Sequence, residues 1–223
     1  MYSAIAPATR AIIHARVGSR ASPRTRVRVG CRAGLFDAFG RGSGTKKAKD
    51  EVLRLAREQR RGVGHSPEDR AEMETAVDAL IASRGNVGRA NTRATVLTAD
   101  WRLAWTSENE TLFLLEKFPG GGDDGGAPIT QAYQRIDVDA GTLRNEVVFS
   151  NGNTFVVDSV IEVTDETRVE FRFTKAALNL LAPAEASLPL PPFGRGWFDN
   201  VYVDGELRVA RDSRGDTLVV VRD

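Results

Sequence analysis

Beyond residue 100, apolar and polar residues alternate along the chain with a period of two. In residues 101–105 (WRLAW) the two tryptophans and Leu103 fall on one face, opposite Arg102 and Ala104. In residues 169–173 (VEFRF) every second residue is apolar and the intervening ones are charged. This alternation is typical of antiparallel strands with one buried face. It predicts that five large apolar side chains face the interior of a sheet: Trp101, Leu103, Trp105, Phe171 and Phe173.

Further segments have the same pattern, and glycine-containing turns separate them, as at Asn151-Gly152, Asp204-Gly205 and Arg214-Gly215. Short strands at this spacing, with no helices between them, predict an antiparallel meander that closes into a β-barrel over residues 99–223. The Pro-rich segment 183–192 and the Gly-rich segment 120–126 are interpreted as long loops. The further strand segments are 131–138, 142–150, 154–163, 198–203, 206–211 and 216–222.

Ahead of the strands, residues 46–84 predict a short helix pair. Good helix formers run from Lys46 to about Arg61, and two glycines end this pattern. Residues 66–69 (SPED) then combine an N-cap serine, a proline at the first helical position and an acid at the third, which is a capping-box arrangement. Apolar residues recur at helical spacing from Met73 to Ile81. The predicted fold class is therefore mainly β (α+β), with a helix pair preceding an antiparallel barrel.

Charge is distributed unevenly along the 223 residues, although their net charge is only +1. Residues 1–32 contain seven arginines and no acid, which leaves 24 basic and 30 acidic residues in the rest of the chain. An Arg-rich, acid-free start is typical of an organelle transit peptide, whereas a basic arm that binds nucleic acid normally accompanies a basic domain. We expect residues 1–32 to be a chloroplast transit peptide, with plastid favoured over mitochondrion by the sequence VGCRA at 29–33. Residues 33–45 would form a flexible mature N-terminus.

The chemical motifs in the chain all have simpler structural interpretations. Beyond the transit peptide the only histidine is His65, which lies between the two helices without a G-x-S-x-G elbow elsewhere. The G-x-G-x-x-G pattern at 120–125 is followed by Pro128 rather than by a helix, so a loop is favoured over a dinucleotide site. Asp137 and Asp139 lack the distal glutamate of a calcium loop. We therefore expect no catalytic residues, no cofactor and no metal site, and hence no enzyme.

Hydropathy and charge also exclude some classes of partner. No stretch approaches the roughly 18 consecutive apolar residues of a spanning helix, so no transmembrane segment is expected. The acidic balance of the chain beyond residue 32 disfavours nucleic acid as a partner.

Three segments resemble the plastid lipid-associated protein (PAP)/fibrillin family. Residues 196–216 (GWFDNVYVDGELRVARDSRGD) are similar to the closing motif of the family, and residues 101–108 (WRLAWTSE) are similar to its first strand. Residues 133–137 (YQRID), followed by Asn145, resemble its second and third strands, and Arg61-Gly62 falls where its helical part carries Arg-Gly. The resemblance extends in the same order over about residues 46–223.

This resemblance implies a lipocalin-like barrel and a location in the plastid, at plastoglobules or thylakoids. It also implies a non-catalytic role in which the protein binds or coats apolar lipids or isoprenoids, contributing to storage, transport and photoprotection. The expected partners are a hydrophobic ligand and a lipid surface that the protein contacts peripherally. The alternative is an interaction module, in which helices 46–84 recruit an enzyme of the isoprenoid or quinone pathway.

The sequence is compatible with two roles for each of three groups of residues. The inward-facing apolar side chains line either a lipid site or a packed core. The motif residues either close the barrel, with Arg208 or Arg211 stacked on Trp101, or orient a lipid head group. An apolar strip, flanked by Arg195, either straps the barrel mouth or enters a lipid-droplet surface. The residues of this strip are Leu188, Leu190, Phe193, Trp197 and Phe198. The motif residues are Trp197, Asp199, Tyr202, Asp204, Arg208 and Arg211, and the expected droplet contacts are Leu188, Leu190 and Phe193.

Overall fold

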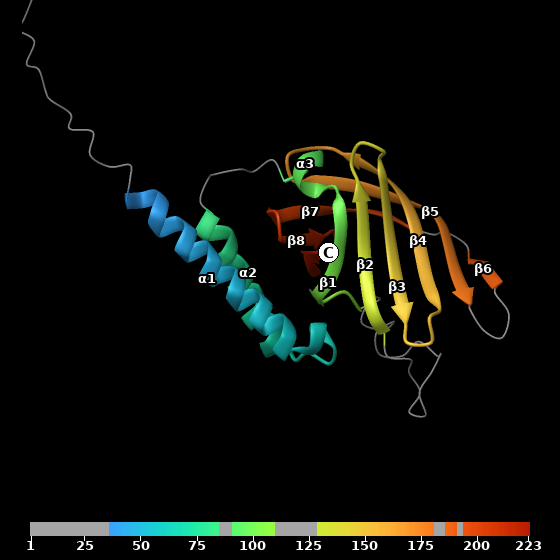
Figure 1. The fold of residues 1–223 in the computed structure, drawn as a ribbon, viewed down its shortest axis with the longest axis horizontal. Helices are drawn as coiled ribbons and strands as arrows, with labels where there is room; N and C mark the ends of the chain where they lie inside the picture. Colours follow the sequence, from blue (N-terminus) through green and yellow to red (C-terminus); the bar gives the residue numbers. More distant parts are fainter. Residues whose placement is uncertain (1–35, 85–90, 110–128, 181–185, 191–193) are drawn as a thin grey trace, which may run out of the picture. The chain divides into compact units, whose positions relative to one another are not determined.

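The computed structural model describes residues 36–84, 91–109, 129–180, 186–190 and 194–223 (Figure 1). The predicted transit peptide, the Gly-rich loop and Phe193 lie outside the described residues. The described chain begins with helix α1 (Phe36–Glu58), the 3-10 turn η1 (Arg60–Gly62), helix α2 (Pro67–Arg84) and the short helix α3 (Ala94–Leu97), and nine strands follow.

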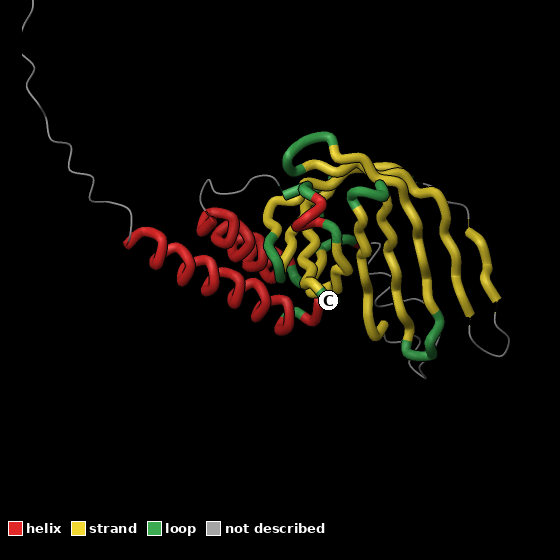
Figure 2. The backbone as a smooth tube through the Cα atoms, turned by 45° about the horizontal axis from the view of Figure 1, so that its top comes forward, coloured by secondary structure: helices red, strands yellow, loops and turns green. Residues whose placement is uncertain are grey.

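Eight of these strands form a closed antiparallel ring (Figure 2). Each strand from β1 to β4 pairs with the next one along the chain, β5 pairs with β7, and β7 to β9 again pair in sequence. The ring closes where β9 pairs with β1. The predicted antiparallel meander is therefore confirmed. The strands are β1 (Ala99–Thr106), β2 (Ile129–Asp137), β3 (Thr142–Phe149), β4 (Thr154–Val163), β5 (Arg168–Leu180), β6 (Ala186–Leu190), β7 (Arg195–Val203), β8 (Leu207–Asp212) and β9 (Thr217–Arg222).

Strand β6 corrects the prediction that residues 183–192 are a long loop. Its residues pair with the second half of β5, and the first half of β5 pairs with β7 instead. Proline has no N–H to donate to a neighbouring strand, so it is disfavoured in the centre of a sheet. Because β6 pairs with one neighbour only among the described strands, Pro189 is accommodated at an edge.

The wall formed by β8 and β9 is buried on both of its faces. Toward the inside of the ring, Ala210 and Val220 join a core that also contains Trp101. Toward the outside, Val209 and Val219 join a second core, made with the two long helices. The ring and the helix pair therefore share one wall, and burial on its two sides holds both layers together.

Two β-bulges decide which aromatic side chains enter which core. The register of β1 against β9 shifts between Leu103 and Trp105, and the register of β7 against β8 shifts between Asn200 and Tyr202. An extra residue in one strand reverses the face of every side chain after it. Leu103 therefore packs inside the ring, while Trp105 and Tyr202 pack outside it, under the helices. The prediction that Trp105 shares a face with Trp101 and Leu103 is wrong for this reason.

The predicted start of α2 is confirmed by its hydrogen bonds. The backbone N–H of Asp69 donates to Ser66 Oγ at 3.1 Å, and the backbone N–H of Ser66 donates to Asp69 Oδ2 at 2.9 Å. These reciprocal bonds satisfy N–H groups that a helix start otherwise leaves unpaired. Helix α1 begins ten residues earlier than the predicted Lys46. Thr45 Oγ1, which donates to the backbone oxygen of Ser83 at 3.3 Å, ties this part of α1 to α2.

The helix pair packs against the outer face of the ring, and the contact between them is apolar. Val52 of α1 and the α2 residues Met73, Val77 and Leu80 are fully buried in the outer core. Trp105 is fully buried in the same layer, and its Nε1 donates to Gln59 Oε1 at 2.9 Å. Burial of side chains of this size contributes about 1.5–3 kcal/mol each.

Gly196 in β7 provides a test of the packing inside the ring. It lies opposite Phe171, and a Cβ atom at this position would come within 2.9 Å of Phe171 Cζ. The Phe171 ring is stacked between Phe173 and Phe198, at centroid distances of 5.4 Å and 6.2 Å. It therefore has little room to move aside.

We expect Gly196→Ala to lower the free energy of unfolding by about 1–3 kcal/mol through overpacking. Gly205→Ala is the matched control, because no atom lies within 4 Å of a Cβ at that turn, and it should change stability by less than about 0.5 kcal/mol. Urea unfolding followed by tryptophan fluorescence measures both variants. Equal stability of the two would contradict the packing described here.

Candidate functional site

One end of the ring is closed by α3 and by two stacked side chains. Trp101 is fully buried, and its Nε1 donates to the backbone oxygen of Leu97 at 2.9 Å. The Arg222 guanidinium lies 4.8 Å from the centre of the Trp101 ring, and it donates to two backbone carbonyl groups at the end of α3. The prediction that Arg208 or Arg211 stacks on Trp101 is wrong. Arg222 does so because the pairing of the first and last strands sets it directly opposite Trp101.

The inside of the ring is filled largely by its own side chains. Leu103 is only 5 % exposed and Phe198 only 6 %. Phe171 and Phe173 are half-buried and form one stacked row with Phe198. Of the five side chains predicted to face the interior, Trp101 and Leu103 are therefore part of a packed core, the two phenylalanines are partly accessible, and Trp105 lies outside the ring.

A buried arginine crosses this apolar interior. Arg208 has no exposed surface, and its Nε donates to Asn200 Oδ1 at 2.7 Å while Nη1 donates to Gln134 Oε1 at 2.5 Å. Its guanidinium also lies 5.0 Å from the ring centre of Phe198. Burial lowers the pKa of Arg208 to about 9, and the carboxylate of Glu108 opposes this effect. The first hydrogen bond connects β8 to its neighbour β7, and the second crosses the interior of the ring from β8 to β2.

Three other residues of the closing motif fasten the helix pair to the ring. Tyr202 Oη donates to Asp204 Oδ2 at 2.6 Å, and Lys49 Nζ of α1 donates to the same carboxylate oxygen at 2.9 Å. Arg211 Nη2 donates to two carboxylates of α2 at 2.7 Å each. Burial raises the pKa of Tyr202, and its hydrogen bond to Asp204 adds to this effect. Tyr202, Asp204 and Arg211 therefore have a structural role, since they attach the helices to the ring.

The remaining two motif residues hold another arginine on the outer face of the ring. Arg168 of β5 donates to both carboxylate oxygens of Asp199, each at 2.8 Å. The same guanidinium stacks on the Trp197 ring, 3.7 Å from its centre. Trp197 and Asp199 therefore fix β7 to β5 from outside. Phe198, predicted to belong to a surface strip with Trp197, instead packs inside the ring.

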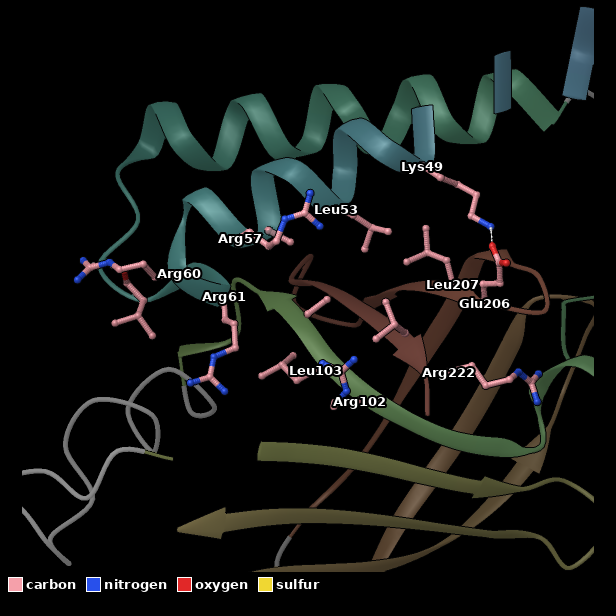
Figure 3. Close-up of a pocket in the computed structure, with 14 residues that line it drawn as sticks. Lys49, Leu53, Arg57, Arg60, Arg61, Arg102, Leu103, Glu206, Leu207 and Arg222 are labelled. Atoms are coloured by element: carbon pink, nitrogen blue, oxygen red, sulfur yellow. Dashed lines mark hydrogen bonds and ion pairs between the residues drawn. The ribbon is translucent and has the colours of Figure 1, made fainter. Parts of the chain in front are cut away.

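A cleft of about 910 Å³ lies between α1 with η1 and the outer surface of β1, β8 and β9 (Figure 3). Its apolar lining comes from α1, from the turn after η1 and from the strands. Several of these apolar side chains are only half-buried, so they are accessible to a guest molecule. The apolar lining residues are Leu53, Ala56, Val63, Ala104, Leu207 and Val221, and Leu103, whose side chain packs in the core of the ring, borders the cleft on β1.

The rim of this cleft is strongly basic. Six basic side chains line it, against the single acid Glu206. At one end Lys49 is neutralised by two carboxylates, since its Nζ lies 2.9 Å from Asp204 and 2.5 Å from Glu206. Arg60 and Arg61 mark the other end in Figure 3. The basic residues are Lys49, Arg57, Arg60, Arg61, Arg102 and Arg222.

The backbone at the basic end has an unusual conformation. Arg60 and Arg61 have φ angles of 47° and 64°, in the left-handed region that favours glycine. This conformation costs a residue with a side chain about 1–2 kcal/mol. Burial lowers the pKa of the Arg61 guanidinium. Two successive arginines thus occupy positions where glycine would be more stable.

The sequence pattern did not reveal this cleft. Its residues come from four separate segments, between Lys49 and Arg222. The one local signal was Arg61-Gly62, which the family resemblance singled out. The predicted droplet contacts Leu188 and Leu190 lie on β6, and Phe193 is not among the described residues.

Within the described ranges, no group of three His, Cys, Asp or Glu side chains is arranged to hold a metal ion. His65 Nδ1 lies 2.7 Å from the backbone oxygen of Gly62, in the turn between the helices. No helix in the described part is long and apolar enough to cross a membrane. The molecule is a mainly β protein, in which a helix pair and a strand ring enclose an amphipathic cleft.

Comparison with known proteins identifies the family. The PAP_fibrillin family model matches residues 46–221. A protein named "Probable plastid-lipid-associated protein 11, chloroplastic", from Arabidopsis thaliana, is 41 % identical over 180 residues, which are 79 % of this chain and 80 % of the relative. This chain therefore belongs to the PAP/fibrillin family, and the predicted resemblance is confirmed.

A second Arabidopsis thaliana relative, named "Probable plastid-lipid-associated protein 12, chloroplastic", is 29 % identical over 177 residues. This match covers 74 % of the present chain but only 42 % of the relative, so the present chain corresponds to less than half of that protein. No solved structure matches the chain.

The contacts of Asp204 lead to a prediction about pH. Burial alone would raise the pKa of this carboxyl group, but hydrogen bonds from Tyr202, Lys49 and the backbone N–H groups of Glu206 and Leu207 hold it below its usual value. A carboxyl group with a lowered pKa stabilises the folded state at pH values above its unfolded pKa of about 3.9. This contribution is lost as the pH falls through the lower, folded pKa.

We therefore expect Asp204→Asn to cost about 2 kcal/mol at neutral pH, because a charged acceptor is lost. The stability difference between the variant and the unmodified protein should shrink as the pH falls below about 4. Urea unfolding across this pH range measures the difference. Asp139→Asn, at an exposed turn position, is the control. A difference for Asp204→Asn that does not vary with pH would contradict the proposed contacts.

Arg208 and Arg211, three residues apart in β8, should respond differently to truncation. We expect Arg208→Ala to lower the free energy of unfolding by about 2–4 kcal/mol, because it leaves a cavity and removes the donor to the buried amide of Asn200 and the half-buried amide of Gln134. Arg211→Ala removes partly exposed ion pairs and should cost less than about 1 kcal/mol. Thermal and urea unfolding measure both. Similar losses would show that Arg208 does not have the buried role described here.

Proposed function

We propose that the protein is a non-catalytic, plastid lipid-associated protein that binds the apolar part of a lipid or isoprenoid in the cleft beneath α1. The amphipathic cleft is the observation that carries this proposal. Its volume of about 910 Å³ is within the usual range of about 300–1,000 Å³ for small-molecule sites. Membership of the family and the names of the two relatives support the plastid and the association with lipid.

Apolar burial in the cleft favours a long chain over a short one. Each buried methylene contributes about 0.8 kcal/mol, so a chain of about fifteen carbons contributes about 12 kcal/mol. Association itself costs about 4–15 kcal/mol. A short acyl chain therefore binds weakly, whereas an isoprenoid or a long acyl chain binds with higher affinity because it buries more methylenes.

In this proposal the ring is a lipocalin-like barrel whose interior serves mainly as a core. Trp101 and Leu103 are packed tightly against their neighbours, which leaves the helix–ring cleft as the larger space for a guest. The partly accessible row of Phe171 and Phe173 offers a second apolar contact at the ring. The basic closing residue Arg222 lies at the cleft rim, close to the shared wall.

Plastoglobules and thylakoids are the lipid surfaces that fit this function. The proposed contact is peripheral and uses the β6 segment, with Leu188 and Leu190, together with Phe193. Strand β6 pairs with one neighbour only among the described strands, so it lies at an edge that can approach a surface. Apolar residues of this kind partition into the boundary between lipid head groups and chains.

Lipid retention by the full chain tests the proposal. The protein is incubated with vesicles of thylakoid lipid extract and reisolated, and the retained lipid is quantified by mass spectrometry. Leu53→Gln places a polar amide on the apolar surface of the cleft, and we expect it to reduce retention about tenfold, equivalent to about 1.4 kcal/mol.

Val163→Gln is the control for this experiment. Val163 is one of the exposed large apolar residues of the described chain, at 38 % exposure on β4, and it does not line the cleft. Its substitution should leave retention unchanged, while circular dichroism verifies that both variants fold. If the unmodified protein retains no lipid, or if both variants retain as much as it does, the proposed lipid site is wrong.

A further inference from the structure

The two ends of the cleft differ in charge, and this difference bears on what the cleft binds. At one end Lys49 is balanced by Asp204 and Glu206, at 2.9 Å and 2.5 Å. At the other end Arg57 and Arg60 are exposed, and neither has a carboxylate within ion-pair distance among the described residues. Apolar surface that includes Leu53 lies between the two ends (Figure 3).

We propose that the cleft binds a single-chain amphiphile with an anionic head group, whose head lies at Arg57, Arg60 and Arg61 and whose chain runs along the apolar lining toward Lys49. This inference rests on the proposed lipid-binding function and adds the chemical class and the orientation of the ligand. A phosphate is the head group best suited to this end, because guanidinium groups bind its oxygens through paired, charge-assisted hydrogen bonds.

The backbone of η1 supports this assignment independently. Arg60 and Arg61 have positive φ angles of 47° and 64°, where glycine or asparagine would be favoured. Contacts of the Arg60 side chain within the protein offset little of this cost, since its hydrogen bond to the backbone oxygen of Val63 is exposed and 3.4 Å long. Unfavourable backbone conformations of this kind tend to persist where a side chain has a function.

The spacing along α1 gives the ligand its direction. Lys49, Leu53 and Arg57 are separated by four residues each, so they lie on one face of the helix, which is the face that lines the cleft. Leu53 is half-buried and Arg57 is exposed. A chain lying against Leu53 therefore has its head beside Arg57 and the η1 arginines.

Isothermal titration of the full chain with three probes tests the proposal. The probes are dodecyl phosphate, dodecanol and inorganic phosphate, each below its aggregation concentration. We expect dodecyl phosphate to bind about tenfold more tightly than dodecanol. This advantage should decrease as salt increases from about 0.05 M to about 0.5 M, because exposed charges are screened.

The double variant Arg57→Gln and Arg60→Asn removes two charges at the basic end. Asparagine tolerates a positive φ, so the variant should unfold at an unchanged or higher temperature. We expect it to lose the preference for dodecyl phosphate while its affinity for dodecanol stays the same. Arg54→Gln is the matched control on α1, since Arg54 pairs with Glu51 and Glu58 and does not line the cleft.

Each alternative result has a distinct meaning. Equal affinity for dodecyl phosphate and dodecanol would overturn the anionic head group and leave the proposed lipid binding intact. Inorganic phosphate that binds as tightly as dodecyl phosphate would overturn the amphiphile in favour of a free anion. If neither dodecyl probe binds, the proposed function fails together with this inference. An equal loss of phosphate preference in Arg54→Gln would reject the assigned end of the cleft.

Discussion

Burial of β8 and β9 on both faces is the constraint that joins the two layers of this protein. Val209 and Val219 face the helices, while Ala210 and Val220 face the inside of the ring. Antiparallel hydrogen bonds satisfy the backbone polar groups of a wall that water cannot reach. Because both faces exclude water, the helices cannot separate from the ring without exposing apolar surface.

The closing family motif acts mainly at this shared wall. Tyr202, Asp204 and Arg211 reach outward to the helices, whereas Arg208 reaches inward to Asn200 and Gln134. A β-bulge separates the inward-facing residues of β7 from Tyr202. One short segment therefore organises both cores, and each of these four polar residues has at least one hydrogen-bond partner within the protein.

The amphipathic cleft is a consequence of how α1 meets the ring. Ala56 and Ala104 have short side chains on the two sides of the cleft, so the helix and β1 leave space between them, while larger residues fill the contact between α2 and the wall. The turn η1 then brings two arginines to the end of this space. A packed ring interior and an accessible cleft outside it together favour the surface beneath α1 as the functional part of the molecule.

The local properties of this protein followed from its sequence alone. Alternation located the strands, Ser66 and Asp69 marked a helix start, and the motif at 196–216 indicated the family, since each depends on neighbouring residues. Contacts between distant segments decided the rest. A bulge turned Trp105 outward, the pairing of β9 with β1 placed Arg222 on Trp101, and pairing with β5 made a strand of β6. The cleft is formed by four segments that are distant in the sequence. The hydrophobic pattern within any one segment does not show that they come together.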